Sequence, residues 1–357
     1  MPIQRTSNIE LFRIITMLLI VAHHYVVNSG LMPMVAGDYP SVKSIFLLLF
    51  GWAGKTGIDC FVFITGYFMC VSQITFRKGL KLLLWVEFYN VVLLCVFVAM
   101  GYINLSYGTI CKGLMPILEV KDGFVSCYLI FFCFIPFLNI LIRGMSPKQH
   151  LILVFLCLIV FSVFPQLRIH VVQNYVGWFM VVYLVASYFK LYPPRWSLSK
   201  KYTGLVLIAL IFLSFVGVLM GGELFLYSGK RSLFYFFVAD ANKPLAIATA
   251  TAAFLFFNNL KIGYNKIINT IAASAFGVLL IHANSDAMRQ WLWHDVLDNV
   301  GHYSGNICLH AVFSVVVIYV VCTLVDFARI QLLEKPFFKW FDNRHPTDRS
   351  GSISEKL

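Results

Sequence analysis

Charged residues are scarce in this sequence, and that scarcity excludes an ordinary soluble domain. Only 12% of the 357 residues are charged and 60% are hydrophobic, whereas a typical soluble domain is about 25% charged. Apolar runs long enough to cross a bilayer recur along the chain. The composition therefore predicts a polytopic membrane protein of the all-α class.

Linkers, long loops and internal repeats are also missing. No Gly/Ser-rich or Pro-rich linker divides the chain, and no loop is long enough to form a soluble domain. We expect one membrane domain over residues 1–340 and a polar cytoplasmic tail over 341–357, which ends in the disordered segment TDRSGSISEKL. The lack of a repeat of fixed period disfavours transporter folds built from inverted repeats.

Sequence motifs of several common metal-binding and catalytic sites are absent as well. The nine cysteines are scattered without a Cys-x-x-Cys pair, which favours apolar packing over metal ligation. We find no Gly-rich phosphate loop, zinc-binding spacing, paired acids typical of glycosyltransferases or serine nucleophile elbow. The sequence therefore predicts no bound metal and no tightly bound cofactor.

Ten apolar segments are long enough to span a bilayer of about 30 Å. They lie near residues 11–28, 58–73, 80–101, 124–142, 151–165, 174–190, 204–221, 233–257, 268–284 and 308–330. With both termini in the cytoplasm, nineteen of the 28 Lys and Arg residues fall on the inner side, as the positive-inside rule requires. This distribution over short loops explains the net charge of +12 without a nucleic-acid partner.

The first apolar segment carries two polar groups that are costly to bury in lipid. Arg13 and His24 stand eleven residues apart in LFRIITMLLIVAHHYVV, so they lie on one face of a helix, roughly 16 Å apart. Arg13 also interrupts any signal-peptide pattern, and we expect this segment to stay as a helix. Ionisable groups within a membrane helix are functional candidates.

Further motifs follow along the chain. Residues 57–69 read GIDCFVFITGYFM, a basic cluster follows at Arg77, Lys78 and Lys81, residues 274–283 read SAFGVLLIHA, and residues 332–340 read LLEKPFFKW. Together with the Arg13–His24 spacing, these motifs resemble the acyltransferase-3 family of integral membrane acyltransferases. Its members carry Arg, ten residues and then His in the first helix, and a second helix similar to GVDLFFVLSGFL. This chain has Thr65 where Ser is usual and Ala283 where Pro is common.

The resemblance implies transfer of an acyl group, often acetyl, from a cytoplasmic acyl-CoA to a cell-surface polysaccharide or its lipid-linked precursor. It also implies a multi-pass protein of a cell membrane, which we expect to be the bacterial cytoplasmic membrane. Transfer to a hydroxyl needs a base, and histidine suits that task near neutral pH. We expect His24 to be this base and His23, about 100° away around the helix, to be a packing or substrate-binding group. Asp59 either orients the His24 imidazole or caps the second helix.

The donor is expected to bind on the inner side. Arg13, with Arg77 and Lys78, is predicted to hold the phosphates of the acyl-CoA. The alternative for Arg13 is that it snorkels to the lipid headgroups.

Three further polar features leave their roles open. His282 either contributes to the substrate site or forms a structural hydrogen bond. Asp240 and Lys243, predicted to lie on one helix, are interpreted as a structural pair. Trp291 and Trp293 are expected at the membrane interface, with sugar stacking as the alternative.

Two other function classes remain open from the sequence. A glycan transporter or flippase would use Arg13 and His24 to bind and move its substrate. A polysaccharide polymerase, also a membrane protein, is the other alternative. Dependence on acyl-CoA distinguishes the acyltransferase from both.

Overall fold

The computed structural model describes residues 6–118 and 123–345, and these residues form helices and turns without a strand. Of these described residues, 78% are helical, which confirms the predicted all-α class. The helices of eight or more residues are α1 (Ser7–Val27), α2 (Leu31–Asp38), α3 (Val42–Phe50), α4 (Gly54–Met69), α5 (Phe76–Ala99), α6 (Tyr107–Leu114), α7 (Phe124–Arg143), α8 (Pro147–Leu158), α10 (Tyr175–Leu191), α11 (Lys200–Ser228), α12 (Pro244–Asn258), α13 (Lys266–Ala273), α14 (Ala275–His282), α16 (Ile307–Arg329) and α17 (Lys335–Arg344).

The number of membrane spans is lower than ten when each helix is judged by length and composition. Seven helical stretches of the described residues qualify, and an eighth is added if a pair bent by 94°, Lys266–His282 with Asp286–Val296, counts as one span. Helices α10 and α12 are apolar but shorter. The structure thus shows a multi-pass membrane protein and does not establish the predicted ten spans.

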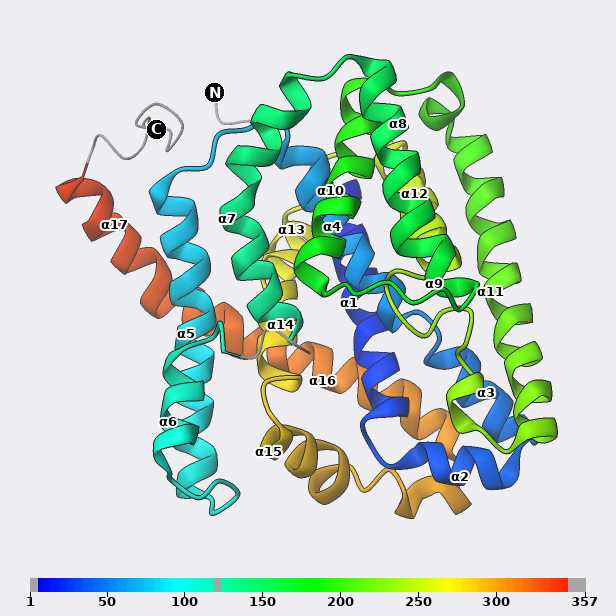
Figure 1. The fold of residues 1–357 in the computed structure, drawn as a ribbon. Coiled ribbons are helices and arrows are strands. Elements are labelled where there is room, and N and C mark those ends of the chain that lie inside the picture. The colour runs from blue at the N-terminus through cyan, green and yellow to red at the C-terminus, as the bar shows by residue number, and fades with distance from the viewer. Residues whose placement is uncertain (1–5, 119–122, 346–357) are drawn as a thin grey trace.

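Helix α4 lies at the centre of the bundle, where it packs against α1, α10 and α12 (Figure 1). Its glycines permit these close approaches. A Cβ atom at Gly57 would lie 2.6 Å from Ile20, and one at Gly66 would lie 2.9 Å from Ala186. The resulting core contains several large side chains with almost no exposed surface: Phe63, Phe131, Phe179, Tyr183 and Phe254.

The predicted span 233–257 is wrong at its start. Helix α12 begins only at Pro244, because proline lacks the backbone N–H that a continuing helix needs and Lys243 before it is extended. Asp240 and Lys243 therefore lie in a turn rather than on one helix, and their interpretation as a helical pair is also wrong. The Lys243 ammonium instead lies over the Phe236 ring, 5.0 Å from its centroid.

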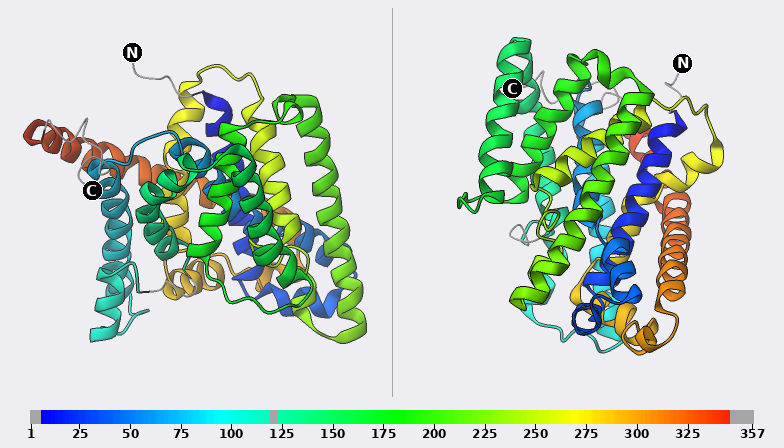
Figure 2. Two further views of the ribbon diagram at one scale, coloured as in Figure 1. Left: turned by 45° about the horizontal axis from the view of Figure 1, so that its top comes forward. Right: turned by 90° about the vertical axis from the view of Figure 1, so that its right-hand side faces the viewer.

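The last span continues without a break into an arm that leaves the bundle (Figures 1 and 2). Helix α16 passes through a π-helical turn, Ile330–Glu334, into α17. Helical structure thus extends to Arg344, beyond the expected domain boundary at residue 340, and the predicted disordered segment 347–357 lies outside the described residues. The start of α1 and the end of α17 both lie toward the upper end of Figure 1.

Candidate active site

A large cavity opens at the end of the bundle where α1 finishes and α4 begins. Its volume is about 1180 Å³. The C-terminal ends of α1, α5 and α14 line it, together with α6 and the residues that precede α7. Several side chains that suit sugar hydroxyls face it: Asn28, Asn90, Asn104, Ser126, Asn284 and Ser285.

His24 lies on the wall of this cavity and is hydrogen-bonded to His282. His24 Nδ1 is 3.0 Å from His282 Nε2, although the two residues are 258 positions apart. His282 is buried at the end of α14, and its Nδ1 lies 2.6 Å from the carbonyl oxygen of Val278, one turn earlier. The fold therefore brings together two of the residues selected from the sequence.

These bonds assign the protons of both rings. The Val278 carbonyl only accepts, so His282 Nδ1 donates to it and His282 Nε2 of the neutral ring is an acceptor. His24 Nδ1 must then donate to His282 Nε2, which leaves His24 Nε2 as the unprotonated nitrogen. An unprotonated imidazole nitrogen at a cavity wall is the form that a general base requires.

His23 also lines the cavity but is held in a different way. Its Nδ1 donates to the carbonyl oxygen of Gly51 at 2.6 Å, and the side chain is buried. Helix α4 starts directly against this ring, since a Cβ atom at Gly54 would lie 2.1 Å from His23 Cγ. Only glycine fits at position 54 in this packing.

Asp59 is buried in α4 and is bonded to Trp178. The Trp178 indole N–H donates to Asp59 Oδ1 at 2.8 Å, and Oδ2 has no hydrogen-bond partner among the described residues. The imidazole bonded to His24 is thus His282, and no bond from Asp59 to His24 occurs in the described chain. The capping role is wrong, because α4 begins at Gly54 and places Asp59 inside the helix.

Lys55, which precedes the span expected to begin near residue 58, lines the cavity and was not selected from the sequence. Its ammonium donates to the Tyr175 hydroxyl at 2.9 Å, and that hydroxyl donates to Asp240 Oδ1 at 2.7 Å. Lys55 and Tyr175 both line the cavity with His24. The sequence contained one indication of this placement: Lys55 lies four residues before Asp59, and this spacing puts both residues near one face of α4.

The predicted donor-binding residues lie away from this cavity. Arg13 lies about three turns before His24 on α1. Its side chain is 28% exposed and pairs with Glu10 at 3.3 Å. Arg77 makes two hydrogen bonds to Asp342 of α17, at 2.7 and 3.2 Å. Lys78 is exposed and donates to the carbonyl oxygen of Gln73. Arg13 does not line the pocket that contains Arg77.

Trp291 and Trp293, both expected at the membrane interface, have different surroundings. Trp293 is fully buried and packs edge-on against Tyr25 of α1, whereas Trp291 packs against Phe97 at the end of α5. Trp293 therefore contributes to the hydrophobic core, and its ring is not exposed to lipid headgroups.

A bundle of apolar helices around a polar cavity with a histidine pair defines an integral membrane protein with a candidate site for base-assisted transfer. Residues 6–326 match the family model for the acyltransferase domain of the acyltransferase-3 family. Because the match covers nearly the whole chain, the protein belongs to that family and is a membrane acyltransferase. Comparison with curated proteins and with solved structures gave no match.

Proposed function

We propose that this protein transfers an acyl group, most simply acetyl, from a cytoplasmic acyl-CoA to a hydroxyl of a cell-surface polysaccharide or its lipid-linked precursor. The observation that carries the proposal is the His24–His282 pair, which leaves His24 Nε2 unprotonated on the wall of a polar cavity. Family membership supports the acyl transfer. The polar lining of the cavity supports a hydroxyl-rich acceptor.

The proposed reaction is direct transfer. The acceptor hydroxyl oxygen attacks the thioester carbonyl carbon while His24 Nε2 takes the hydroxyl proton. The carbon–sulfur bond then breaks, and the CoA thiolate takes the proton back from the His24 imidazolium. In the alternative route a histidine nitrogen is acylated first and the acceptor attacks that intermediate. We favour direct transfer because His24 is then free to act as the base.

The positions of the groups support the proposed sidedness of the reaction. The cavity lies at the end of α1 that we assign to the outer side, and Arg13 lies toward the inner end of the same helix. We therefore propose that the donor enters from the cytoplasm, with Arg13, Arg77 and Lys78 near its phosphates, and that the acceptor arrives from outside. The protein works in the cell membrane, proposed to be the bacterial cytoplasmic membrane.

Reconstituted vesicles test this function against its alternatives. Labelled acyl-CoA on the cytoplasmic face and glycan on the other face are expected to give labelled glycan. Glycan that crosses the membrane without label supports a transporter or flippase, and glycan that lengthens supports a polymerase. Label retained on His24 without acceptor supports the acyl-histidine route. Proton NMR of surface polysaccharide from cells with and without the protein then identifies the acyl group.

A further inference from the structure

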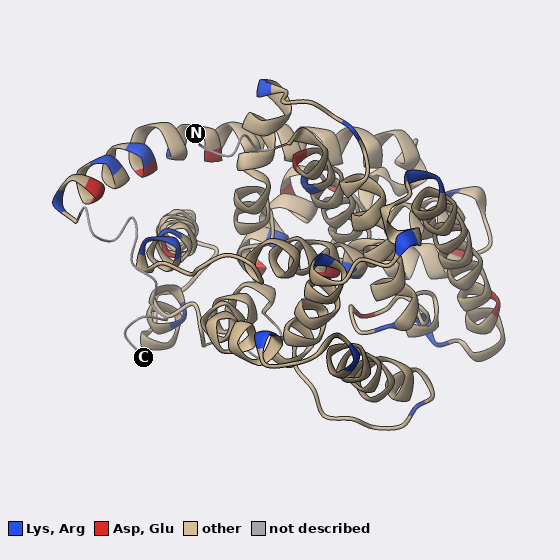
Figure 3. Ribbon diagram, turned by 90° about the horizontal axis from the view of Figure 1, so that it is seen from above, with Lys and Arg blue, Asp and Glu red and all other residues tan. Residues whose placement is uncertain are grey.

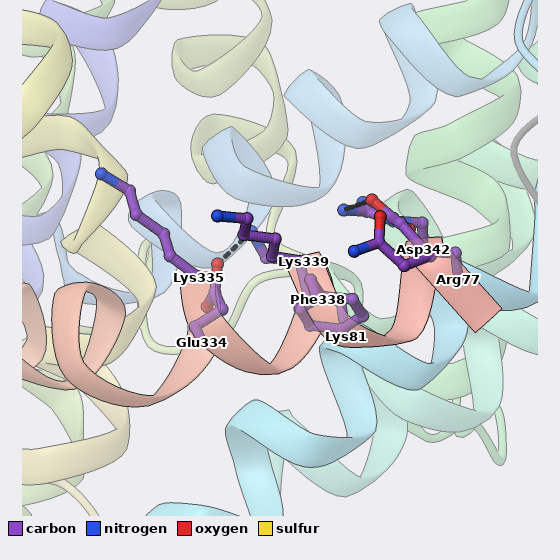
Figure 4. A pocket seen from close by; sticks show the side chains of 8 residues that line it. Arg77, Lys81, Glu334, Lys335, Phe338, Lys339 and Asp342 are labelled. Atoms are coloured by element: carbon purple, nitrogen blue, oxygen red, sulfur yellow. Dashed lines mark hydrogen bonds and ion pairs between the residues drawn. The ribbon is translucent and has the colours of Figure 1, made fainter. Parts of the chain in front are cut away.

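A second cavity, of about 330 Å³, lies between the first turns of α5 and helix α17 (Figure 4). Its charged lining consists of four cations, Arg77, Lys81, Lys335 and Lys339, and two carboxylates, Glu334 and Asp342. The cations therefore exceed the carboxylates. Arg77 and Lys81 lie on α5, and Lys335 and Lys339 lie on α17, along which Figure 3 shows both basic and acidic residues.

Two of the cations are neutralised within the pocket. Asp342 accepts two hydrogen bonds from Arg77, and Glu334 pairs with Lys81. The same Glu334 also accepts from Arg329 at 3.0 Å. Both carboxylates are thus already engaged by cations, and they hold α17 against α5.

Within the part of the chain that the structure describes, the ammonium groups of Lys335 and Lys339 have no carboxylate partner. Lys335 Nζ donates to the neutral amide of Gln331 at 2.8 Å. Lys339 makes no hydrogen bond or ion pair within residues 6–118 and 123–345, and both side chains are exposed. A spacing of four residues places the two ammonium groups on one face of α17. The pocket therefore presents two uncompensated positive charges.

The apolar surface beside the pocket suits a membrane interface. On α17, Phe337 and Trp340 are 37% and 49% exposed, and Leu332 and Leu333 are exposed just before it. A helix with aromatic and basic side chains of this kind lies in the headgroup region of a bilayer. Phosphates are the anions available there, on lipids and on the nucleotide of acyl-CoA.

We propose that this pocket is a phosphate-binding site in which Lys335 and Lys339 bind the anion beside the Arg77–Asp342 pair. A phosphate monoester carries about −1.5 to −2 charge at neutral pH, which balances the two uncompensated ammonium groups. The phosphate belongs either to the nucleotide of the acyl-CoA donor or to the headgroup of an anionic phospholipid. The first source rests on the proposed function, and the second is independent of it.

Replacement of the two lysines by glutamine tests the site. The variant Lys335→Gln/Lys339→Gln removes both uncompensated charges and keeps the Arg77–Asp342 and Lys81–Glu334 pairs. The matched control is Lys200→Gln/Lys201→Gln, which removes two exposed cations at the start of α11. The first probe is adenosine 3′,5′-bisphosphate, titrated into the full-length protein in phosphatidylcholine nanodiscs. The second is phosphatidylglycerol, counted by native mass spectrometry after release from mixed nanodiscs.

We expect the pocket variant to bind one probe roughly 30-fold more weakly, as the loss of two cations near a phosphate implies, while the control keeps normal binding. Weaker nucleotide binding identifies the donor, and lower lipid retention identifies the phospholipid. Unchanged binding of both probes, or equal loss in the control, overturns the proposal. Neither measurement requires turnover. If the protein transfers acyl groups but the lysine substitutions change the binding of neither probe, the proposed phosphate site is wrong and the proposed function stands. If the pocket binds a probe but the protein transfers no acyl group, the proposed function is wrong and the phosphate site stands.

Discussion

At the scale of single residues, the two neighbouring histidines of α1 have different partners and so different capacities. His24 faces His282 and keeps one nitrogen unprotonated, whereas His23 is fixed by the Gly51 carbonyl. We expect His24→Ala to abolish acyl transfer, because loss of a general base typically costs about 100-fold to 10,000-fold. His23→Ala is expected to be milder. Transfer assays at matched protein levels check this, and inactivation by His23→Ala alone would show that the roles are reversed.

His282 is predicted to be a positioning residue that acts through His24. His282→Phe keeps an aromatic ring of similar size but removes the acceptor for His24 Nδ1–H, so kcat should fall on the order of 10-fold or more with a smaller change in KM. His282→Gln retains a carbonyl acceptor and is expected to keep more activity and a pH profile nearer to the original. Equal loss in both variants would indicate that His282 has only a packing role.

Arg13 is predicted to contact the phosphates of the donor. Arg13→Lys keeps the charge and the partnership with Glu10 but loses the planar fork that binds two oxygens at once. We expect weaker acyl-CoA binding to the purified variant, measured by calorimetry, with unchanged insertion into the membrane. Unaltered binding by Arg13→Ala would remove this role and favour contact with lipid headgroups.

At the scale of elements, the contact between α1 and α4 depends on the absence of a side chain at Gly54. A methyl group there would lie 2.1 Å from His23 Cγ, so Gly54→Ala must push the helices apart or move the imidazole. Overpacking of this kind costs about 1–3 kcal/mol, and we expect a lower melting temperature together with lower acyl transfer. Gly37→Ala in α2 has open space around it and serves as the control. A variant at position 54 with normal stability and activity would contradict this packing.

At the scale of the whole molecule, a buried charged network joins α5 to the end of α16. Asp326 Oδ1 accepts hydrogen bonds from Trp85, Tyr89 and Arg329, and both charged side chains are buried. The sequence analysis selected neither Asp326 nor Arg329 as a site residue. The arrangement holds the origin of the α17 arm against the bundle, so it also positions the pocket between α5 and α17.

Removal of Asp326 from this network leaves the buried Arg329 with Glu334 as its one carboxylate partner in the described chain, and it leaves the Trp85 N–H and the Tyr89 hydroxyl without their acceptor. We expect Asp326→Ala to lower the free energy of unfolding by about 3–5 kcal/mol, as for other broken buried pairs, measured by thermal denaturation in detergent. The comparison variant is Asp286→Ala, which breaks an exposed pair with Arg289 and should cost only about 0–1 kcal/mol. Similar melting temperatures for the two variants would contradict a structural role for the network.

The sequence by itself determined the class of protein and the residues of greatest interest. Apolar composition and helical spacing are local properties, so the membrane location, the all-α fold and the shared face of Arg13 and His24 follow from them without tertiary information. The family was likewise identifiable, because its motifs are short and local. The start of α12 could also have been predicted, because Pro244 cannot continue a helix from the residues before it. The apolar run on both sides of Pro244 instead led to a predicted span that began too early.

Only the tertiary structure decided which groups meet. His24 and His282, Arg77 and Asp342, and Lys55, Tyr175 and Asp240 are brought together from positions far apart in the chain. Contacts of this kind depend on how whole helices pack, and the hydrophobic pattern along one helix does not specify which polar group on another helix it faces. The proton positions of the histidine pair follow from such contacts alone, because the acceptor on one ring determines which nitrogen of the next ring remains free to take a proton.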